Sequence, residues 1–128
     1  MKVKKQDKEE ENLEEEIRLI FSTEYVLNCF SDGNEMQYIK FFKIPKIEKL
    51  INNEEIMYSI KQYLANDLII SQTSRSSFMH RNTLIYRVNK FHKLTGLNLK
   101  KFNDSVLFNN MIHIKSFFDT KTKINDIF

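Results

Sequence analysis

The sequence predicts an all-α protein of about six helices, with a helix-turn-helix in its C-terminal half. Apolar residues recur at helical spacing along most of the 128-residue chain. The chain has only two glycines and one proline, whereas a β-sheet protein needs more turn residues. Between residues 71 and 96, two short helical patterns flank a tight break at residues 78–80, which is the layout of a helix-turn-helix.

Residues 1–53 are expected to form an acidic helical region. Its polar start, residues 1–12, is expected to be partly disordered. A helix is predicted from about Glu9, because carboxylates are favoured in the first turns of a helix. The apolar stripe of this helix comprises Leu13, Ile17, Ile20, Phe21, Tyr25, Val26 and Phe30.

Turn residues then divide the chain twice. Residues 31–34, with the sequence Ser-Asp-Gly-Asn, are typical of a turn, and a second helix is predicted over residues 35–43. Pro45 either ends this helix or begins a short following one, because proline is tolerated only in the first turn of a helix. The asparagines at residues 52–53 mark the next break.

Residues 54–118 are expected to form the helix-turn-helix domain, followed by a short tail at residues 119–128. The helix over residues 54–66 repeats apolar residues at i, i+4, i+7 and i+8, namely Ile56, Ile60, Tyr63 and Leu64. Ser71 is the expected N-cap of the first helix of the motif. Phe78 is expected to close that helix and to point inward.

The second helix of the motif, the recognition helix, is predicted over residues 81–94. Gly96 fits the left-handed position just past a helix end. Asn103 or Asp104 is expected to cap a last helix. The positions that this helix is expected to bury are Leu107, Met111, Ile114 and Phe118.

The recognition helix is amphipathic in a way that suits the major groove of DNA. Its apolar face comprises Leu84, Val88, Phe91 and Thr95. Its other face comprises Thr83, Tyr86, Lys90 and Lys93, with Arg87 at the border. Such a helix can pack on a core from behind while it presents donors and positive charge in front.

Charge is distributed unevenly along the chain. Residues 1–58 carry a net charge of −4, and residues 59–128 carry +7. Residues 72–101 contain seven Lys or Arg and no Asp or Glu. Arginine suits bidentate contact with phosphate or guanine, and the C-terminal half therefore predicts a polyanion-binding module. Three of the four arginines lie in this basic window, namely Arg75, Arg81 and Arg87.

The run HRNTLIYRVNKFHKLTGLNL resembles the C-terminal helix-turn-helix of the PucR family and, more distantly, the Fis-type motif. The matching residues are His80, Arg81, Asn82, Thr83, Leu84, Tyr86, Arg87, Val88, Leu94, Thr95 and Gly96. The resemblance covers about residues 54–115 and implies DNA binding in bacterial transcription. PucR-type regulators carry a sensory domain ahead of this motif, and the 53 residues before the match are too few for one. The resemblance therefore supports DNA binding far better than it supports response to a metabolite.

The combined prediction is a sequence-specific, double-stranded DNA-binding transcriptional regulator. Groove contacts are expected from Arg81, Thr83, Tyr86 and Lys90, and phosphate contacts from Arg75, Arg87 and Lys93. His80 and Asn82, at the start of the recognition helix, complete the expected DNA-binding set. Two alternatives stay open: a protein-interaction or adaptor module that retains the helix-turn-helix as a scaffold, and a low-specificity architectural DNA binder.

A homodimer is also expected, because one helix-turn-helix contacts few base pairs and many such proteins pair two half-sites. The aromatic residues that the sequence offers for an interface are Tyr25, Phe30, Phe41 and Phe42.

The sequence argues against an enzyme, a metal protein and a membrane protein. Two glycines are too few to build a glycine-rich phosphate loop, and no nucleophile motif is present. His80, His92 and His113 are spaced too irregularly for paired metal ligands, so no catalytic residue, metal or cofactor is expected. No apolar run approaches the roughly 18 residues of a membrane span, and the single cysteine, Cys29, fits a reducing cytoplasm.

Overall fold

The computed structural model describes residues 13–31, 33 and 35–127, and these residues form helices and connecting turns without a strand. The predicted all-α class is confirmed. The helices are a first one over residues 13–20 (the N-terminal helix), α2 (Thr23–Ser31), α3 (Met36–Phe42), α4 (Pro45–Ile51), α5 (Glu54–Ala65), α6 (Ile70–Ser76), α7 (Arg81–Thr95) and α8 (Phe102–Ile127). The predicted disorder of residues 1–12 and the turn positions Asp32 and Asn34 lie outside the described residues.

Eight helical segments in the described residues exceed the expected six, because the first half of the chain breaks more often than its apolar stripe suggests. Ser22 ends the N-terminal helix and starts α2. Its hydroxyl accepts a hydrogen bond from the Tyr25 backbone N–H at 3.3 Å and donates one to the Leu19 carbonyl at 3.1 Å. Pro45 opens α4 as its first residue, where proline is tolerated.

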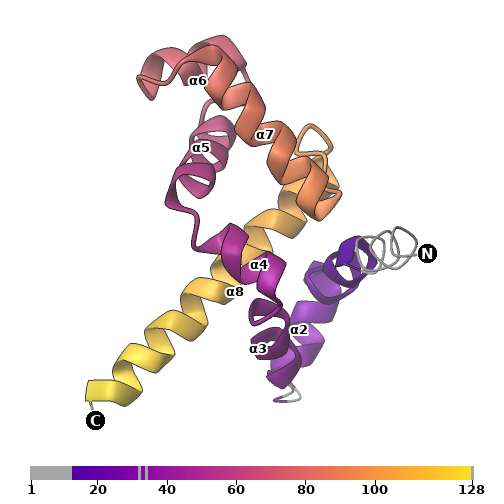
Figure 1. Cartoon of the computed structure of the whole chain (residues 1–128). Helices are drawn as coiled ribbons and strands as arrows, with labels where there is room; N and C mark the ends of the chain where they lie inside the picture. Colours follow the sequence, from indigo (N-terminus) through magenta and orange to yellow (C-terminus); the bar gives the residue numbers. More distant parts are fainter. Residues whose placement is uncertain (1–12, 32, 34, 128) are drawn as a thin grey trace, which may run out of the picture.

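The helices divide into two groups that share α8 (Figure 1). α5, α6 and α7 lie together at one end of the molecule, whereas α2, α3 and α4 lie beside α8 farther along it. α8 continues through residues 119–127, which the sequence analysis treats as a tail. Lys121 in that stretch forms an ion pair with Glu35, with 3.1 Å between Nζ and Oε2.

Aromatic side chains fill the core between the N-terminal helix, α3 and α8. The rings of Phe21, Tyr38, Phe41 and Phe42 contact one another at centroid distances of 5.0 to 5.9 Å. The Tyr38 hydroxyl donates to the Ile20 carbonyl at 2.6 Å, and its burial raises the pKa of this hydroxyl.

This packing corrects the expectation that these aromatics are available for a dimer interface. Phe41 is 1% exposed and Phe42 is 9% exposed, so both belong to the core of a single chain. Tyr25 is half-buried, and its hydroxyl accepts a hydrogen bond from Gln37. The side chain of Phe30 lies outside the described residues.

A buried polar network joins the N-terminal helix to the loop that follows α7. Arg18 Nη1 lies 2.7 Å from Asp104 Oδ1, and Asp104 Oδ2 accepts a hydrogen bond from the Asn98 backbone N–H at 2.8 Å. Asp104 is 3% exposed. The expectation that Asn103 or Asp104 caps α8 is wrong, because α8 begins at Phe102 and the Asp104 carboxylate turns away to Arg18 and Asn98.

Candidate nucleic-acid interface

α6 and α7 are joined by a four-residue turn that is closed by one backbone hydrogen bond and one side-chain hydrogen bond. The Met79 N–H donates to the Ser74 carbonyl at 3.1 Å, and the Ser74 hydroxyl donates to the Met79 carbonyl. Thr73 is buried in α6, and its hydroxyl donates to the Ile69 carbonyl at 2.7 Å. These bonds fix the angle at which the chain leaves α6 and enters α7.

Two sequence expectations about α6 are wrong. The helix begins at Ile70 with Ile69 as its N-cap, so Ser71 lies inside the first turn and is exposed. Phe78 does not point inward, because its backbone is left-handed, with φ of 53°, and its side chain is 97% exposed. Met79 packs inward in its place and contacts the Ser59 hydroxyl through its sulfur.

The ends of α7 confirm the predicted recognition helix. His80 is the N-cap, and its Nδ1 accepts a hydrogen bond from the Asn82 backbone N–H at 3.1 Å. Gly96 is left-handed, with φ of 74°, and its N–H donates to the His92 carbonyl. A Cβ at Gly96 would lie 2.4 Å from the Glu14 carboxyl, so the flexible Glu14 side chain would have to shift, whereas the positive φ itself favours glycine.

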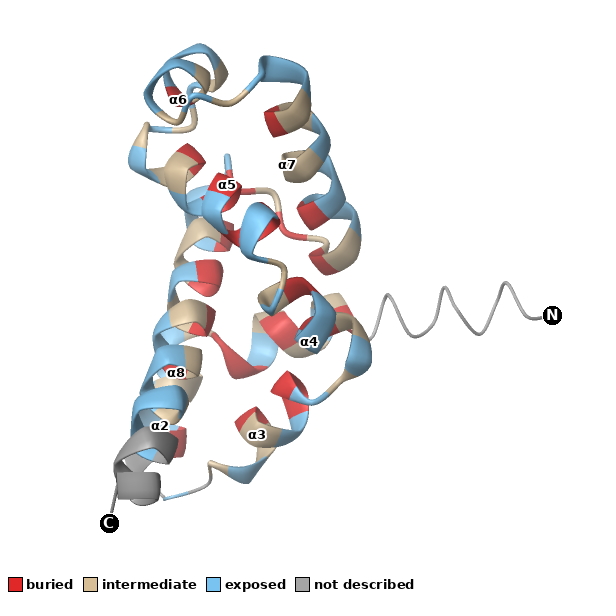
Figure 2. Ribbon diagram, turned by 60° about the vertical axis from the view of Figure 1, so that its left-hand side comes forward, coloured by how far each residue is buried: buried red, intermediate tan, exposed pale blue. Residues whose placement is uncertain are grey.

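α7 has one buried face and one exposed face, as its periodicity predicts (Figure 2). Leu84 and Phe91 are fully buried, and Thr95 is 1% exposed. Phe91 also packs against Phe108 of α8, at a ring centroid distance of 4.9 Å. The buried face therefore fixes α7 to α5 and α8, and Val88 beside it is half-buried.

The exposed face of α7 carries most of the residues that the sequence assigns to DNA. Tyr86 is 63% exposed, and Lys90 Nζ lies 5.9 Å from its ring centroid, within cation–π range. Thr83 is half-buried. The remaining exposed residues of the predicted set are His80, Arg81, Asn82 and Lys93, with Arg75 at the end of α6. We call the solvent-facing surface of α7 formed by Asn82, Thr83, Tyr86, Lys90 and Lys93, together with Arg81 in the exposed first turn, the basic face.

Arg87 is the member of the predicted set that the structure turns inward. Its Nη1 donates to the Ser59 hydroxyl at 3.0 Å, and its Nη2 lies 3.2 Å from Glu55 Oε2. The Arg87 side chain is 20% exposed, whereas Glu55 is 78% exposed. These contacts hold α7 against α5, so the guanidinium orients the basic face instead of belonging to it.

The family comparison agrees with this architecture. Residues 57–113, which run from α5 into α8, match the PucR C-terminal helix-turn-helix domain. We refer to residues 57–113 as the PucR-type domain, after the domain that they match. No solved structure matches the chain significantly.

Two curated relatives of the PucR-type domain have regulatory names. The carbohydrate diacid regulator of Escherichia coli (strain K12) is 33% identical over 64 residues, which cover 50% of this chain and 17% of that protein. The purine catabolism regulatory protein of Bacillus subtilis (strain 168) is 36% identical over 53 residues, which cover 41% of this chain and 10% of that protein. The match thus spans less than a fifth of either relative.

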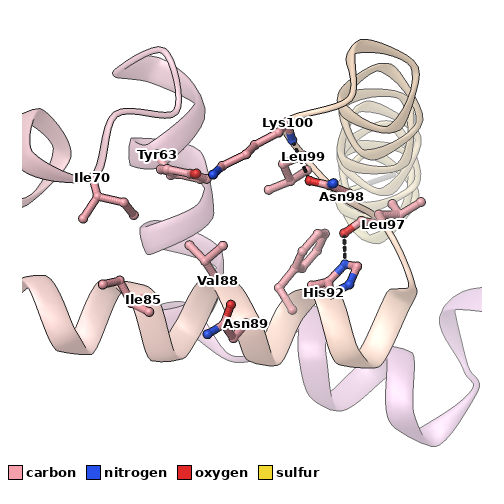
Figure 3. A pocket seen from close by; sticks show the side chains of 11 residues that line it. Tyr63, Ile70, Ile85, Val88, Asn89, His92, Leu97, Asn98, Leu99 and Lys100 are labelled. Atoms are coloured by element: carbon pink, nitrogen blue, oxygen red, sulfur yellow. Dashed lines mark hydrogen bonds between the residues drawn. The ribbon is translucent and has the colours of Figure 1, made fainter.

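Behind the basic face, the PucR-type domain has an open hollow of about 350 Å³ (Figure 3). Val88 and His92 of α7 line one side, and Leu97 lies on the loop that follows. His92 Nδ1 lies 2.8 Å from the Leu97 carbonyl oxygen, which ties this loop back to α7. Tyr63 borders the same hollow from α5, and burial raises the pKa of its hydroxyl.

Among residues 13–31, 33 and 35–127, no three His, Cys, Asp or Glu side chains gather as a metal site would require. No described helix combines the length and the apolar character of a membrane span.

Proposed function

We propose that this chain binds double-stranded DNA in a sequence-specific manner and regulates transcription through α7 of its PucR-type domain. The observation that carries the proposal is the basic face itself. It is exposed and contains no acidic residue, and it lies on a helix whose opposite face is held by Leu84 and Phe91. A helix anchored in this way can enter the major groove without unfolding its own core.

We assign the role of each residue from its position. Arg81 and Asn82 lie in the first turn of α7, the part of a recognition helix that reads base edges, and Thr83, Tyr86 and Lys90 follow along the helix. Arg75 and Lys93 are exposed at the two margins and are assigned to phosphates. His80, the N-cap of α7, is assigned to DNA contacts beside Arg81. Arg87 is assigned a positioning role, because Ser59 and Glu55 occupy its guanidinium.

Selection of bound sequences from random duplex DNA, followed by titration of variants, tests the proposal. Arg81→Ala and Thr83→Ala should weaken binding to the selected site by about 1–3 kcal/mol and should change binding to a scrambled site little. Lys93→Ala should weaken binding to the selected and the scrambled duplex alike. It should also reduce the slope of the logarithm of the binding constant against the logarithm of salt concentration by about one. Equal losses on both duplexes for Arg81→Ala and Thr83→Ala would favour a low-specificity architectural binder.

A homodimer on paired half-sites and a cytoplasmic location accompany this proposal. Because Phe41 and Phe42 are buried within one chain, a dimer has to use other residues. Light scattering at micromolar concentration, with and without the selected duplex, should show two chains per site. Monomer under both conditions would remove the homodimer from the account and leave DNA binding by a single chain.

A further inference from the structure

Phe78 in the turn between α6 and α7 contradicts two preferences of local structure at once. Its side chain is 97% exposed, although a buried phenyl ring would stabilise the fold. Its φ of 53° lies in the left-handed region, which favours glycine or asparagine. Neither feature helps the domain to fold, because Met79 makes the inward contact of this turn. Residues held against such preferences are enriched at functional sites.

The Phe78 ring lies on the same side of the motif as the start of α7. Phe78, His80 and Thr83 line one open hollow of about 520 Å³. The opposite wall of this hollow is formed by the first turns of α5, including Glu54 and Glu55. The ring therefore borders the part of the basic face that is assigned to base contacts.

The charges around this hollow indicate which part of DNA the ring contacts. Glu54 and Glu55 are exposed on the α5 wall, and carboxylates repel the phosphate backbone. Arg87 pairs with Glu55 at 3.2 Å and offsets one of the two carboxylates, so this wall keeps a net negative charge from Glu54. Base edges carry no net charge, and the apolar group that they expose in the major groove is the 5-methyl of thymine.

We propose that Phe78 contacts the 5-methyl group of a thymine at the edge of the site that α7 reads. This contact would set a preference for thymine through a residue that lies outside the recognition helix. The proposal rests on the proposed DNA-binding function of α7 and adds one base pair to the sequence that the chain recognises.

Replacement of single thymines by uracil tests this contact directly, because uracil lacks only the 5-methyl group. The duplex is one selected by the unaltered full-length chain, and each of its thymines is replaced in turn. The unaltered chain should lose roughly tenfold in affinity at one thymine. Phe78→Ala should bind the thymine duplex about tenfold more weakly and lose nothing further with uracil at that position. Phe78→Leu should restore part of the affinity.

Phe102→Ala is the matched control, because Phe102 is an 85% exposed phenylalanine that does not line the hollow. This variant should keep the affinity and the thymine preference of the unaltered chain. Phe78→Ala should also keep the unfolding temperature of the unaltered chain, and a fall in that temperature would mean that the ring is structural.

Three results overturn the proposal. If Phe78→Ala keeps the same thymine-to-uracil ratio as the unaltered chain, or if no thymine replacement weakens binding, the contact is absent while DNA binding by α7 stands. If the unaltered chain binds no duplex DNA, the proposed function fails together with this inference.

Discussion

The N-terminal region, before α5, buries its central aromatic residues, whereas the PucR-type domain buries some, such as Phe91 and Phe108, and leaves others exposed. In the N-terminal region, Phe21, Tyr38 and Phe41 are at most 1% exposed and contact one another. In the PucR-type domain, Phe78 and Tyr86 are 97% and 63% exposed. Full burial of an aromatic side chain stabilises a fold by about 1.5–3 kcal/mol. The domain leaves this stabilisation unused at Phe78 and Tyr86, which fits residues kept free for a ligand.

The contrast predicts opposite phenotypes for aromatic truncation in the two regions. Phe41→Ala should destabilise the fold by about 3–5 kcal/mol, a large share of a typical total of about 5–15 kcal/mol. Tyr86→Ala should leave the free energy of unfolding nearly unchanged and should weaken DNA binding. Urea denaturation and DNA titration of both variants give the comparison. An equal loss of stability in the two variants would mean that Tyr86 belongs to the core.

The same contrast applies to the two faces of α7. Leu84 is fully buried and Lys90 is exposed. Leu84→Ala should therefore cost roughly 2–5 kcal/mol of folding free energy, whereas Lys90→Ala should cost little stability and should reduce affinity for DNA. Thermal unfolding of the Leu84→Ala and Lys90→Ala variants measures this difference in stability. Greater destabilisation by Lys90→Ala would reverse the assignment of the faces.

The contribution of Asp104 to the free energy of unfolding should depend on pH, because its carboxylate links the N-terminal helix to the loop after α7. Burial alone would raise the pKa of this carboxyl, but hydrogen bonds from Arg18 and from the Asn98 N–H outweigh burial, and the net pKa lies below its ordinary value. Asp104→Asn keeps the shape and removes the charge, and it should cost about 1–3 kcal/mol at pH 7.

Because the folded-state pKa of Asp104 is depressed, the ionised carboxylate stabilises the fold above the unfolded-state pKa of about 3.9. This stabilisation is lost as pH falls through the folded-state pKa. The stability difference between the unaltered chain and Asp104→Asn should therefore shrink below about pH 4. Urea denaturation at pH 7 and at pH 3 measures it. A difference that stays constant would show that the charge of Asp104 is not the source.

An effect of similar size is expected at Gly96, where the N-terminal helix approaches the end of α7. Gly96→Ala should cost about 1–3 kcal/mol, because a residue with a Cβ is strained at φ of 74° and its Cβ would meet Glu14. In a Glu14→Ala background the steric part of this cost should disappear, and the backbone part should remain. Thermal unfolding of the two single variants and the double variant tests this. Strictly additive effects would mean that the two residues do not interact.

Local patterns in the sequence are sufficient to predict α7. Its spacing of apolar residues predicts the buried positions Leu84 and Phe91, and Gly96 predicts its end, because both signals act within a few residues. The break at Ser22 cannot be predicted from the sequence pattern, because the apolar stripe continues past Ser22 at helical spacing. Burial of Phe41 and Phe42 within a single chain could not be predicted. The spacing of apolar residues identifies the apolar face of a helix, but it does not show whether the same chain or a second chain covers that face.

The partners of two arginines could not be predicted, because they lie far away along the chain. Arg87 pairs with Glu55, 32 residues earlier, and Arg18 pairs with Asp104, 86 residues later. The sequence predicts an inward Phe78, because an apolar residue at the end of a helical pattern usually packs against the core. Its left-handed backbone is set by the hydrogen bonds between Ser74 and Met79, which no residue pattern reveals.

The salt dependence of duplex DNA binding tests most directly the central claim that the exposed basic face is a nucleic-acid interface. If α7 and its margins neutralise about four to six phosphates, the logarithm of the binding constant should fall against the logarithm of salt concentration with a slope of about −4 to −5. A slope near zero, or no binding at about 50–100 mM salt, would contradict the claim and would favour a protein-interaction module that keeps the helix-turn-helix as a scaffold.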